Sequence, residues 1–307
     1  MDTLSVAVIN TLAWFELVGY PLTYAECWRY LWGGTVRATP GQVRTMLNDL
    51  TARGVAAAED GMWSLAGSGT TLAHRSEQAR IAIGKRRRAY RGARLLAHLP
   101  FVRFVGLGNT LALGLARPTS DIDLLIVFKS GRMFLGRLLV TLVLHLIGWR
   151  RHGTKISNRL CLSFYLDDEH LNLKELAYDD DPYLTYWVAT LIPLVGSATY
   201  AALVGDNKWV HERLPNWPGG FGTLAAYEPR PGVIERLLGG AIGDWCEAVA
   251  RRYQLARISR RRGSRLGDGT TAVVVAPGVL KFHESDRRPE LTAAFRARLA
   301  TLGNHVL

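Results

Sequence analysis

Apolar positions in the first 70 residues follow a helical period in three segments and alternate in two short ones. The pattern predicts three helices and a β-hairpin, over residues 6–17, 24–31, 40–53 and 55–65. Thr23, with Glu26 three residues later, predicts a capping box for the second helix, and Thr39-Pro40 begins the third. Three helices followed by a hairpin is the order of a winged helix-turn-helix, so we expect that domain over residues 1–70.

The polar side of the third predicted helix bears on what such a domain does. In a winged helix this helix often enters the major groove of DNA. Here it offers Gln42, Arg44, Asn48 and Arg53. The same pattern also suits a winged helix that serves only for protein packing or substrate positioning, and both uses stay open.

From residue 71 to residue 180 the pattern changes to strands that alternate with helices. A long linking helix covers residues 71–98. Apolar runs then predict three buried strands, over residues 101–107, 122–128 and 159–166. Between the strands we expect a glycine turn with a short helix, and a buried helix, over residues 109–114 and 132–149. This order is typical of an α/β (α+β) fold, with a mixed sheet core over residues 99–180.

After residue 180 the pattern predicts a mostly helical C-terminal domain, residues 181–307, with one late hairpin. The expected helices cover residues 182–203, 208–214, 233–259 and 289–302. Residues 271–282 alternate around Pro277-Gly278 and predict the hairpin.

Composition narrows the class of protein. Hydrophobic residues make up 48% of the 307 residues, which excludes an intrinsically disordered chain. The three cysteines, Cys27, Cys161 and Cys246, lie too far apart for a zinc ribbon or a disulfide framework, so we expect a reducing cytoplasm. The most membrane-like stretch, 133–149, is short and is interrupted by an arginine and a histidine. We therefore expect neither an integral membrane span nor a signal peptide.

The net charge of +12 indicates a polyanionic partner such as nucleic acid, nucleotides or an acidic membrane face. The linking helix concentrates this charge, because its eight cations face a single acid, Glu77. The eight are Arg75, Arg80, Lys85, Arg86, Arg87, Arg88, Arg91 and Arg94. A solvated face and a polyanion-binding surface both fit, and Arg86, Arg87 and Arg88 are the candidate contacts for RNA or DNA.

The segment 105–128 carries the candidate chemistry. Asp121 and Asp123 stand at the start of an apolar strand, and residues i and i+2 of a strand share a face, so the two carboxylates converge. Such a pair suits Mg²⁺ or Mn²⁺, which takes oxygen ligands and keeps positions open for phosphate oxygens. Upstream, Gly108-Asn109-Thr110 ends a strand and begins a helix, where free N–H groups and a hydroxyl predict a phosphate site.

This glycine turn, followed by ten residues and then Asp-Ile-Asp, resembles the signature of the DNA polymerase β-like nucleotidyltransferase superfamily. Other segments resemble landmarks of prokaryotic proteins in which a winged helix is fused to a nucleotidyltransferase domain. They are Tyr20-Pro21-Leu22-Thr23, Leu99-Pro100-Phe101-Val102, Leu160-Cys161-Leu162-Ser163, Asn207-Lys208-Trp209-Val210, Leu214-Pro215-Asn216-Trp217, Lys281-Phe282-His283 and Asp286-Arg287-Arg288.

The resemblance implies a nucleotidyltransferase-type core and a role for each motif residue. Asp121 and Asp123 would be metal ligands, and Gly108, Asn109 and Thr110 would hold the β- and γ-phosphates of an NTP. Arg117 and Lys129 flank the motif and are candidate phosphate contacts, although a solvated position suits them equally.

The superfamily usually supplies a third carboxylate from a later strand, and this chain departs from that pattern. The expected strand offers Cys161 and Ser163 in its interior, while Asp167 and Asp168 lie just past its end as candidate third acids. The resemblance implies Mg²⁺-dependent transfer of an NMP from an NTP to a hydroxyl-type acceptor, which is a nucleic-acid end, a protein or a small molecule. The alternative is a catalytically degenerate fold that binds nucleotide or nucleic acid as a regulator.

Overall fold

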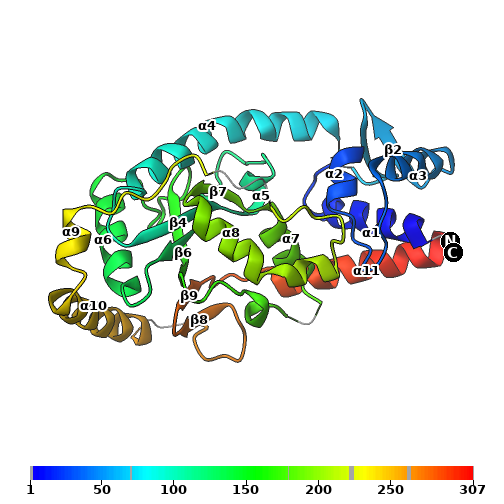
Figure 1. The fold of residues 1–307 in the computed structure, drawn as a ribbon. Coiled ribbons are helices and arrows are strands. Elements are labelled where there is room, and N and C mark those ends of the chain that lie inside the picture. Colours follow the sequence, from blue (N-terminus) through cyan, green and yellow to red (C-terminus); the bar gives the residue numbers. More distant parts are fainter. Residues whose placement is uncertain (1–2, 70, 179, 221–224, 261–263, 307) are drawn as a thin grey trace.

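The described part of the chain is a mixed α/β fold with eleven α-helices and two β-sheets (Figure 1). This computed structural model describes residues 3–69, 71–178, 180–220, 225–260 and 264–306. One sheet has three strands and belongs to the N-terminal elements, and the other has six strands of mixed direction. The α/β class expected from the sequence is therefore confirmed.

Side-chain caps determine where the N-terminal helices begin. After α1 (Thr3–Leu17), α2 (Tyr24–Arg29) starts with the predicted capping box, in which Thr23 and Glu26 satisfy each other's backbone N–H groups. Thr39 and Gln42 form a second capping box at the start of α3 (Pro40–Ala52). The three helices expected here are confirmed.

The predicted hairpin is formed by β2 (Ala56–Glu59) and β3 (Met62–Leu65). Asp60 and Gly61 between them have φ angles of 48° and 75°, the left-handed conformation that a tight two-residue hairpin turn requires. A short strand that the sequence pattern did not predict, β1 (Leu22–Thr23), pairs with β3, so the strand order is β1-β3-β2.

The central sheet has the order β7-β4-β5-β6-β9-β8, in which β5 and β6 run parallel and every other neighbouring pair runs antiparallel. The strands are β4 (Val102–Leu107), β5 (Ile122–Phe128), β6 (Leu160–Asp167), β7 (Ile192–Val195), β8 (Val273–Ala276) and β9 (Val279–Phe282). The expected helices around the first three strands are α4 (Leu72–Leu96), α5 (Asn109–Ala112) and α6 (Met133–Leu146).

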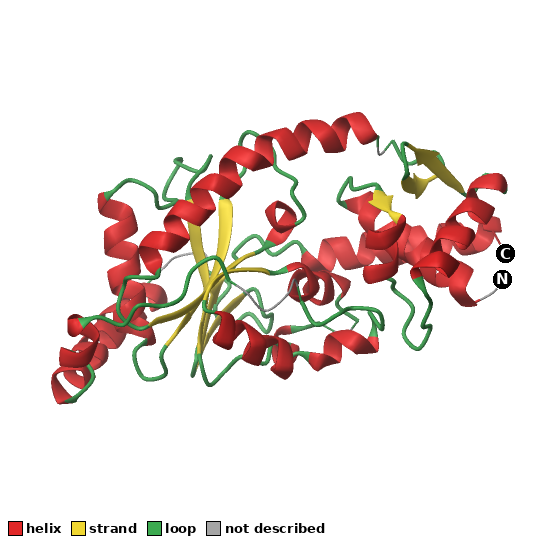
Figure 2. Ribbon diagram, turned by 45° about the horizontal axis from the view of Figure 1, so that its top comes forward, coloured by secondary structure: helices red, strands yellow, loops and turns green. Residues whose placement is uncertain are grey.

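Side chains of the central sheet alternate between two hydrophobic cores, and Figure 2 shows the strands lying between helices. In β5, Leu125 and Val127 pack in the core that contains α7 (Pro182–Thr190) and α8 (Ser197–Asp206). Leu124 and Ile126 pack in the core that contains α4 and α6. Because strand side chains alternate, Asp123 belongs to the face of α7.

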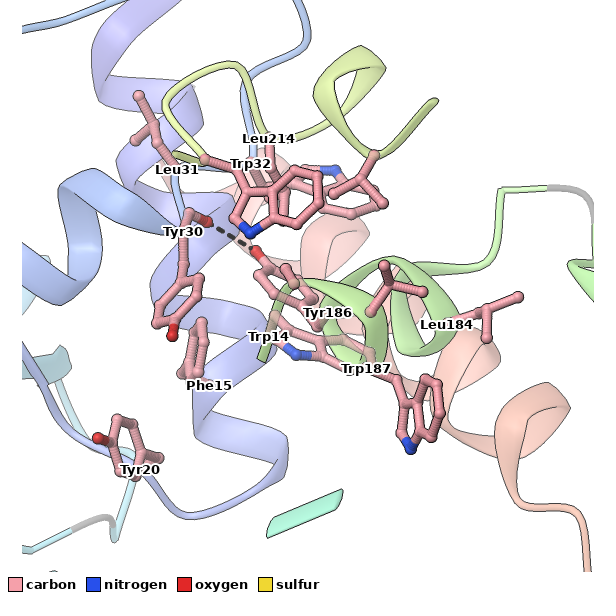
Figure 3. Packing of buried hydrophobic residues seen from close by; sticks show 14 of the residues in the cluster. Trp14, Phe15, Tyr20, Tyr30, Leu31, Trp32, Leu184, Tyr186, Trp187 and Leu214 are labelled. Atoms are coloured by element: carbon pink, nitrogen blue, oxygen red, sulfur yellow. Dashed lines mark hydrogen bonds between the residues drawn. The ribbon is translucent and has the colours of Figure 1, made fainter. Parts of the chain in front are cut away.

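A cluster of aromatic rings joins the N-terminal elements to α7 (Figure 3). Tyr186 of α7 stacks on Trp14 of α1 and on Trp32, with ring centroids 5.2 and 5.5 Å apart. Its hydroxyl donates a hydrogen bond of 3.0 Å to the backbone oxygen of Tyr30. Phe295 of α11 (Arg288–Val306) meets both tryptophans edge-on, so the chain's two ends pack on the same helix.

The C-terminal part corrects two expectations. The single helix expected over 182–203 is wrong, because β7 separates α7 from α8 and pairs with β4. Pro193 lacks an N–H and Gly196 has a φ of 85°, so neither suits a helix interior, whereas an edge strand tolerates proline. The helix expected over 233–259 is likewise two helices, α9 (Val233–Leu237) and α10 (Ala241–Ser259).

The late hairpin is confirmed as β8 and β9, but it does not stand apart, because β9 pairs with β6. Three of the six strands in the central sheet therefore come from beyond residue 180. The helix expected over 208–214 is a 3-10 helix, Lys208–Glu212, and another covers Lys174–Leu176.

Buried charges fasten this hairpin and α11 to the rest of the protein. Arg288 donates hydrogen bonds to the backbone oxygen of Leu176 (2.7 Å) and to the hydroxyl of Thr271 (2.7 Å). Its guanidinium also pairs with the carboxylates of Asp286 and Asp181.

Within the described residues, no helix is both long enough and apolar enough to span a bilayer.

Asn207 supplies a test of how the C-terminal segments are held. Its amide is fully buried, donates to the backbone oxygens of Leu171 (2.7 Å) and Leu203 (2.8 Å), and accepts from the N–H of Leu173 (2.8 Å). We predict that Asn207→Ala leaves these groups unpaired and lowers the free energy of unfolding by about 2–4 kcal/mol, measured by urea unfolding. The exposed Asn172→Ala should cost less than about 1 kcal/mol, and equal losses in the two variants would contradict the prediction.

Candidate functional site

Three strands bring the candidate residues together at one end of the central sheet. β5 and β6 begin there and the antiparallel β4 ends there, since Leu107 pairs with Leu124 and Asp123 pairs with Cys161. Ligand atoms of Asp121, Asp123 and Cys161 all lie within 4.8 Å of one another. The convergence of the two carboxylates expected from their i, i+2 spacing is present.

Asp123 is oriented by a short hydrogen-bonded relay. Asn109 donates from Nδ2 to Asp123 Oδ2 (2.7 Å), and Tyr183 of α7 donates its hydroxyl to Asn109 Oδ1 (2.7 Å). Asn109 holds a φ of 58°, a left-handed conformation that Asn tolerates better than most residues. Burial, together with the nearby charge of Asp121, raises the pKa of Asp123 to about 6.

The glycine of this turn is required by a close contact. The indole of Trp187 packs directly on Gly108, where a Cβ would lie 2.8 Å from its Nε1 atom. The Gly108 N–H donates to the backbone oxygen of Asp123 (3.2 Å), which ties the turn to β5. Trp187 therefore fixes the turn against the strand that carries the acids.

Cys161 occupies the position on β6 opposite Asp123, and a second chain of polar groups leads away from it. Its thiol donates to Ser163 Oγ (3.3 Å), and Ser163 Oγ lies 2.9 Å from Nε2 of His283. One extra residue in β6 relative to β5 forms a bulge between these positions. Burial, then the charge of Asp123, raises the pKa of Cys161 to about 12, so the thiol is neutral.

Asp121 has a different partner. Arg151, in the loop between α6 and β6, places Nη1 2.7 Å from Asp121 Oδ2 and 3.5 Å from Cys161 Sγ. The loop before Asp121 is held from α4, because Lys85 donates to the backbone oxygens of Pro118 (3.1 Å) and Ser120 (2.6 Å).

These groups line a cavity of about 1820 Å³. Its wall carries eight Arg and Lys side chains against five acids, so it offers room and a net positive charge for a polyphosphate. The basic residues are Arg117, Arg137, Arg150, Arg151, Arg257, Lys281, Arg287 and Arg288. Thr110 is exposed and lines the same cavity beside Asn109, while α5 itself has only four residues.

The structure does not bring the candidate third acids to this site. Asp167 pairs with Phe128, five residues along β5 from Asp123, which is roughly 16 Å at the rise of a strand. Asp167 contacts His170, and Asp168 accepts from the N–H of Ser130 (2.7 Å). Lys129 follows β5 at that same far end, so it too lies away from the aspartate pair.

The arginines of α4 separate into different roles. Arg86 donates to the backbone oxygens of Leu111 (3.1 Å) and Ala112 (2.6 Å), so it caps α5 and is not free for a ligand. Arg88 lies over the ring of Trp149, 4.9 Å from its centroid, and Arg87 is exposed. Arg87 and Arg88 line a separate shallow pocket of about 530 Å³.

The donor set fits a divalent cation held through oxygen. Two carboxylates lie side by side in a largely buried position, where the charge of a metal would relieve their mutual repulsion. The neutral Cys161 thiol is a soft donor and adds no ligand of the kind that Mg²⁺ prefers. The protein therefore offers two oxygen ligands, and phosphate oxygens of a nucleotide would have to complete the coordination.

Four residues of this site did not stand out as site residues in the sequence. Arg151 lies in a loop with other basic residues, and Tyr183 and Trp187 lie in an apolar helix that is buried almost all round and looks like ordinary core. For His283 the sequence favours a structural histidine over one that faces a pocket, and the structure places it on the cavity wall. Their contribution depends on pairing between strands and helices that are far apart in the sequence.

No protein-family model, no curated protein and no solved structure matches this chain. The structure itself defines a mixed α/β protein with an Asp-Asp-Cys cluster in a basic cavity.

His283 gives the site a pH-dependent stability. Burial lowers its pKa from 6.5 to about 4, so the unfolded chain takes up a proton before the folded one as the pH falls. The contribution is present above pH 6.5 and is lost as the pH falls toward 4. We predict that wild type loses about 2 kcal/mol more than His283→Gln between about pH 7.5 and about pH 5, measured by urea unfolding. A difference between the two proteins that does not change with pH would contradict this.

Proposed function

We propose that this protein is a metal-dependent nucleotidyltransferase, which moves an NMP from an NTP to a hydroxyl-type acceptor and releases pyrophosphate. The observation that carries the proposal is the convergence of Asp121 and Asp123 beside the Gly108-Asn109-Thr110 turn in a cavity rich in cations. A metal-holding acid pair next to a phosphate-binding turn is what nucleotidyl transfer requires.

In this proposal the chain's residues bind and orient the nucleotide. Asp121 and Asp123 would hold Mg²⁺ or Mn²⁺, which when bound would neutralise charge on the phosphates during in-line attack. Asn109 and Tyr183 keep Asp123 in place, and Thr110 offers a hydroxyl to a phosphate oxygen.

The transfer forms a bond from the acceptor oxygen to the α-phosphorus and breaks the bond from that phosphorus to the β-phosphate oxygen. Among the described residues no third carboxylate joins the pair, so the acceptor's proton leaves to water. Arg117 lines the cavity and is the candidate contact for the leaving pyrophosphate.

We further propose nucleic acid as the acceptor, because the pocket on α4 is an unbalanced basic surface. Arg87, Arg88 and Arg91 supply its charge, while Lys85 also lines it but is buried and holds the loop before Asp121. Burial is the first cause that lowers the pKa of Arg88, and the nearby charges of Arg159 and Arg91 are the second. Like charges therefore lie close together at this pocket. Phosphates of an RNA or DNA backbone would neutralise such a cluster.

The N-terminal elements support a winged-helix domain within this proposal. They place three helices before a hairpin, and β1 completes a three-stranded sheet. Arg44 and Asn48 on α3 and Arg53 at its C-cap are exposed, whereas Gln42 is used in the capping box. Of the two uses left open by the sequence, substrate positioning gains support from the aromatic packing on α7, the helix that also supplies Tyr183.

The alternative is a nucleotide- or nucleic-acid-binding regulator that does not catalyse. Cys161 favours it, because a neutral thiol stands on β6 where it pairs with Asp123, and the two candidate acids lie at the far end of that strand. We expect a reducing cytoplasm for either function, because the three thiols are free.

Metal-dependent turnover tests the proposed enzyme. We predict that wild type with Mn²⁺ or Mg²⁺ transfers label from an α-labelled NTP to an RNA pool and that Asp121→Ala/Asp123→Ala reduces transfer to background, because the metal ligands are gone. Asp49→Ala/Glu77→Ala removes two exposed carboxylates elsewhere and should retain full activity. Transfer to protein or to small molecules would support the proposed nucleotidyltransferase and contradict nucleic acid as its acceptor. Nucleotide binding without transfer in any acceptor pool would favour the regulator.

The basic pocket on α4 gives a separate test of the nucleic-acid partner. We predict that Arg87→Ala/Arg91→Ala weakens binding of a fluorescent RNA oligonucleotide and lowers the salt dependence of its affinity by about two ions, measured by anisotropy at several salt concentrations. Arg251→Ala/Arg252→Ala removes the same exposed charge from α10 and should have a much smaller effect. Equal losses in the two variants would show that only the net charge matters.

A further inference from the structure

Arg151 places a positive charge where a metal ion would be expected. Its Nη1 atom lies 2.7 Å from Asp121 and 3.5 Å from Cys161, which are two of the three residues in the candidate metal cluster. The guanidinium occupies Oδ2 of Asp121, and a divalent cation on the same carboxylate would lie close enough for the two positive charges to repel. The contact of Arg151 with Asp121 and the binding of a metal to Asp121 therefore oppose each other.

The backbone and the side chain of Arg151 differ in freedom. Its N–H donates to the backbone oxygen of Leu160 (2.9 Å), and the neighbouring Arg150 forms a bridge with the same residue, so the loop is fastened to the start of β6. The Arg151 side chain is 44% exposed, whereas that of Asp121 is 16% exposed. The guanidinium can leave Asp121 without moving the loop.

The Arg151 guanidinium loses little free energy when it leaves Asp121, and phosphate oxygens in the cavity would be a second partner for it. An ion pair whose arginine is 44% exposed contributes only modestly, because water partly screens it and the long side chain loses freedom in it. Arg151 also lines the cavity that would hold the triphosphate. A guanidinium matches the spacing of phosphate oxygens and binds them through paired N–H groups.

We propose that Arg151 is an exchangeable cation that occupies the metal position on Asp121 until metal and nucleotide arrive and then binds the phosphates of the nucleotide. This inference rests on the proposed function, since it assigns a further nucleotide-binding residue to the same site. In this arrangement the Arg151 side chain has opposite effects on two affinities. Its guanidinium weakens the binding of the metal, with which it competes, and strengthens the binding of the nucleotide, which it attracts.

Direct binding measurements test this exchange without reference to turnover. Mn²⁺ binding to the full chain is followed by electron paramagnetic resonance in the absence of nucleotide, and binding of ATP is followed by calorimetry with Mg²⁺ present. We compare wild type with Arg151→Ala, with the matched control Arg150→Ala, which removes a cavity-lining arginine with no contact to Asp121 among those the structure describes, and with Asp121→Asn.

Arg151→Ala should bind Mn²⁺ about twofold to fivefold more tightly than wild type, the factor that an ion pair of this exposure is worth. It should bind ATP with Mg²⁺ about tenfold more weakly, because charged hydrogen bonds to phosphate are lost. Arg150→Ala should leave Mn²⁺ binding unchanged. This opposite response of two ligands is not expected of a residue that only stabilises the loop.

Two other outcomes separate the inference from the proposed function. If Asp121→Asn loses Mn²⁺ binding while Arg151→Ala matches Arg150→Ala for both ligands, the Arg151 inference is wrong and the metal site stands. If Asp121→Asn binds Mn²⁺ as wild type does, the metal site is wrong and the proposed function fails with it. Tighter Mn²⁺ binding in Arg151→Ala without weaker ATP binding would overturn the assignment of Arg151 to phosphate.

Discussion

The repulsion between two carboxylates at the start of β5 is the constraint on which the arrangement of the site depends. Asp121 and Asp123 share one face of a strand in a largely buried position, where charge is disfavoured. Each surrounding polar group offsets part of the free-energy cost of burying these two charges. Arg151 pairs with Asp121, and Asn109 donates to Asp123. The raised pKa of Asp123 indicates that the compensation is incomplete, and a divalent cation is the group that would complete it.

Helix α7 connects this site to the N-terminal elements. Tyr186, on one side of the helix, lies in the aromatic cluster with Trp14 and Trp32. Tyr183 and Trp187, on the same helix, hold Asn109 and Gly108 of the turn between β4 and α5. A shift of the N-terminal elements would therefore act on the turn through a rigid helix, since packed aromatic rings tolerate little change. This gives the proposed winged helix a physical route to the site, and residues 14–19, at the end of α1 and in the turn after it, line the same cavity.

Local sequence patterns predicted the parts of the fold that are decided locally. The capping box at Thr23, the helix that starts at Pro40, the hairpin turn at Asp60-Gly61 and strand β5 all lie where the pattern placed them. β7 was missed because an apolar run of four residues between two helices has no period of its own and becomes a strand only by pairing with β4. Arg151 and Tyr183 were missed for the same reason, because their roles arise from contacts across 30 and 74 positions of sequence.

The thiol of Cys161 explains how the site balances its charge before any ligand arrives. A carboxylate in that position would put three like charges within a few ångströms in a buried site, and Arg151 alone would face all of them. With a neutral thiol in this position the site holds two acids, and the raised pKa of Asp123 makes that carboxyl easier to protonate. The single guanidinium of Arg151 therefore nearly balances the negative charge of the site. The neutral thiol also weakens the site for a bare metal, since the described cluster would offer Mg²⁺ two carboxylates and no third one. Under the proposed function, metal and nucleotide are therefore expected to enter together, because the phosphates would supply the missing oxygens and give the displaced Arg151 a new partner.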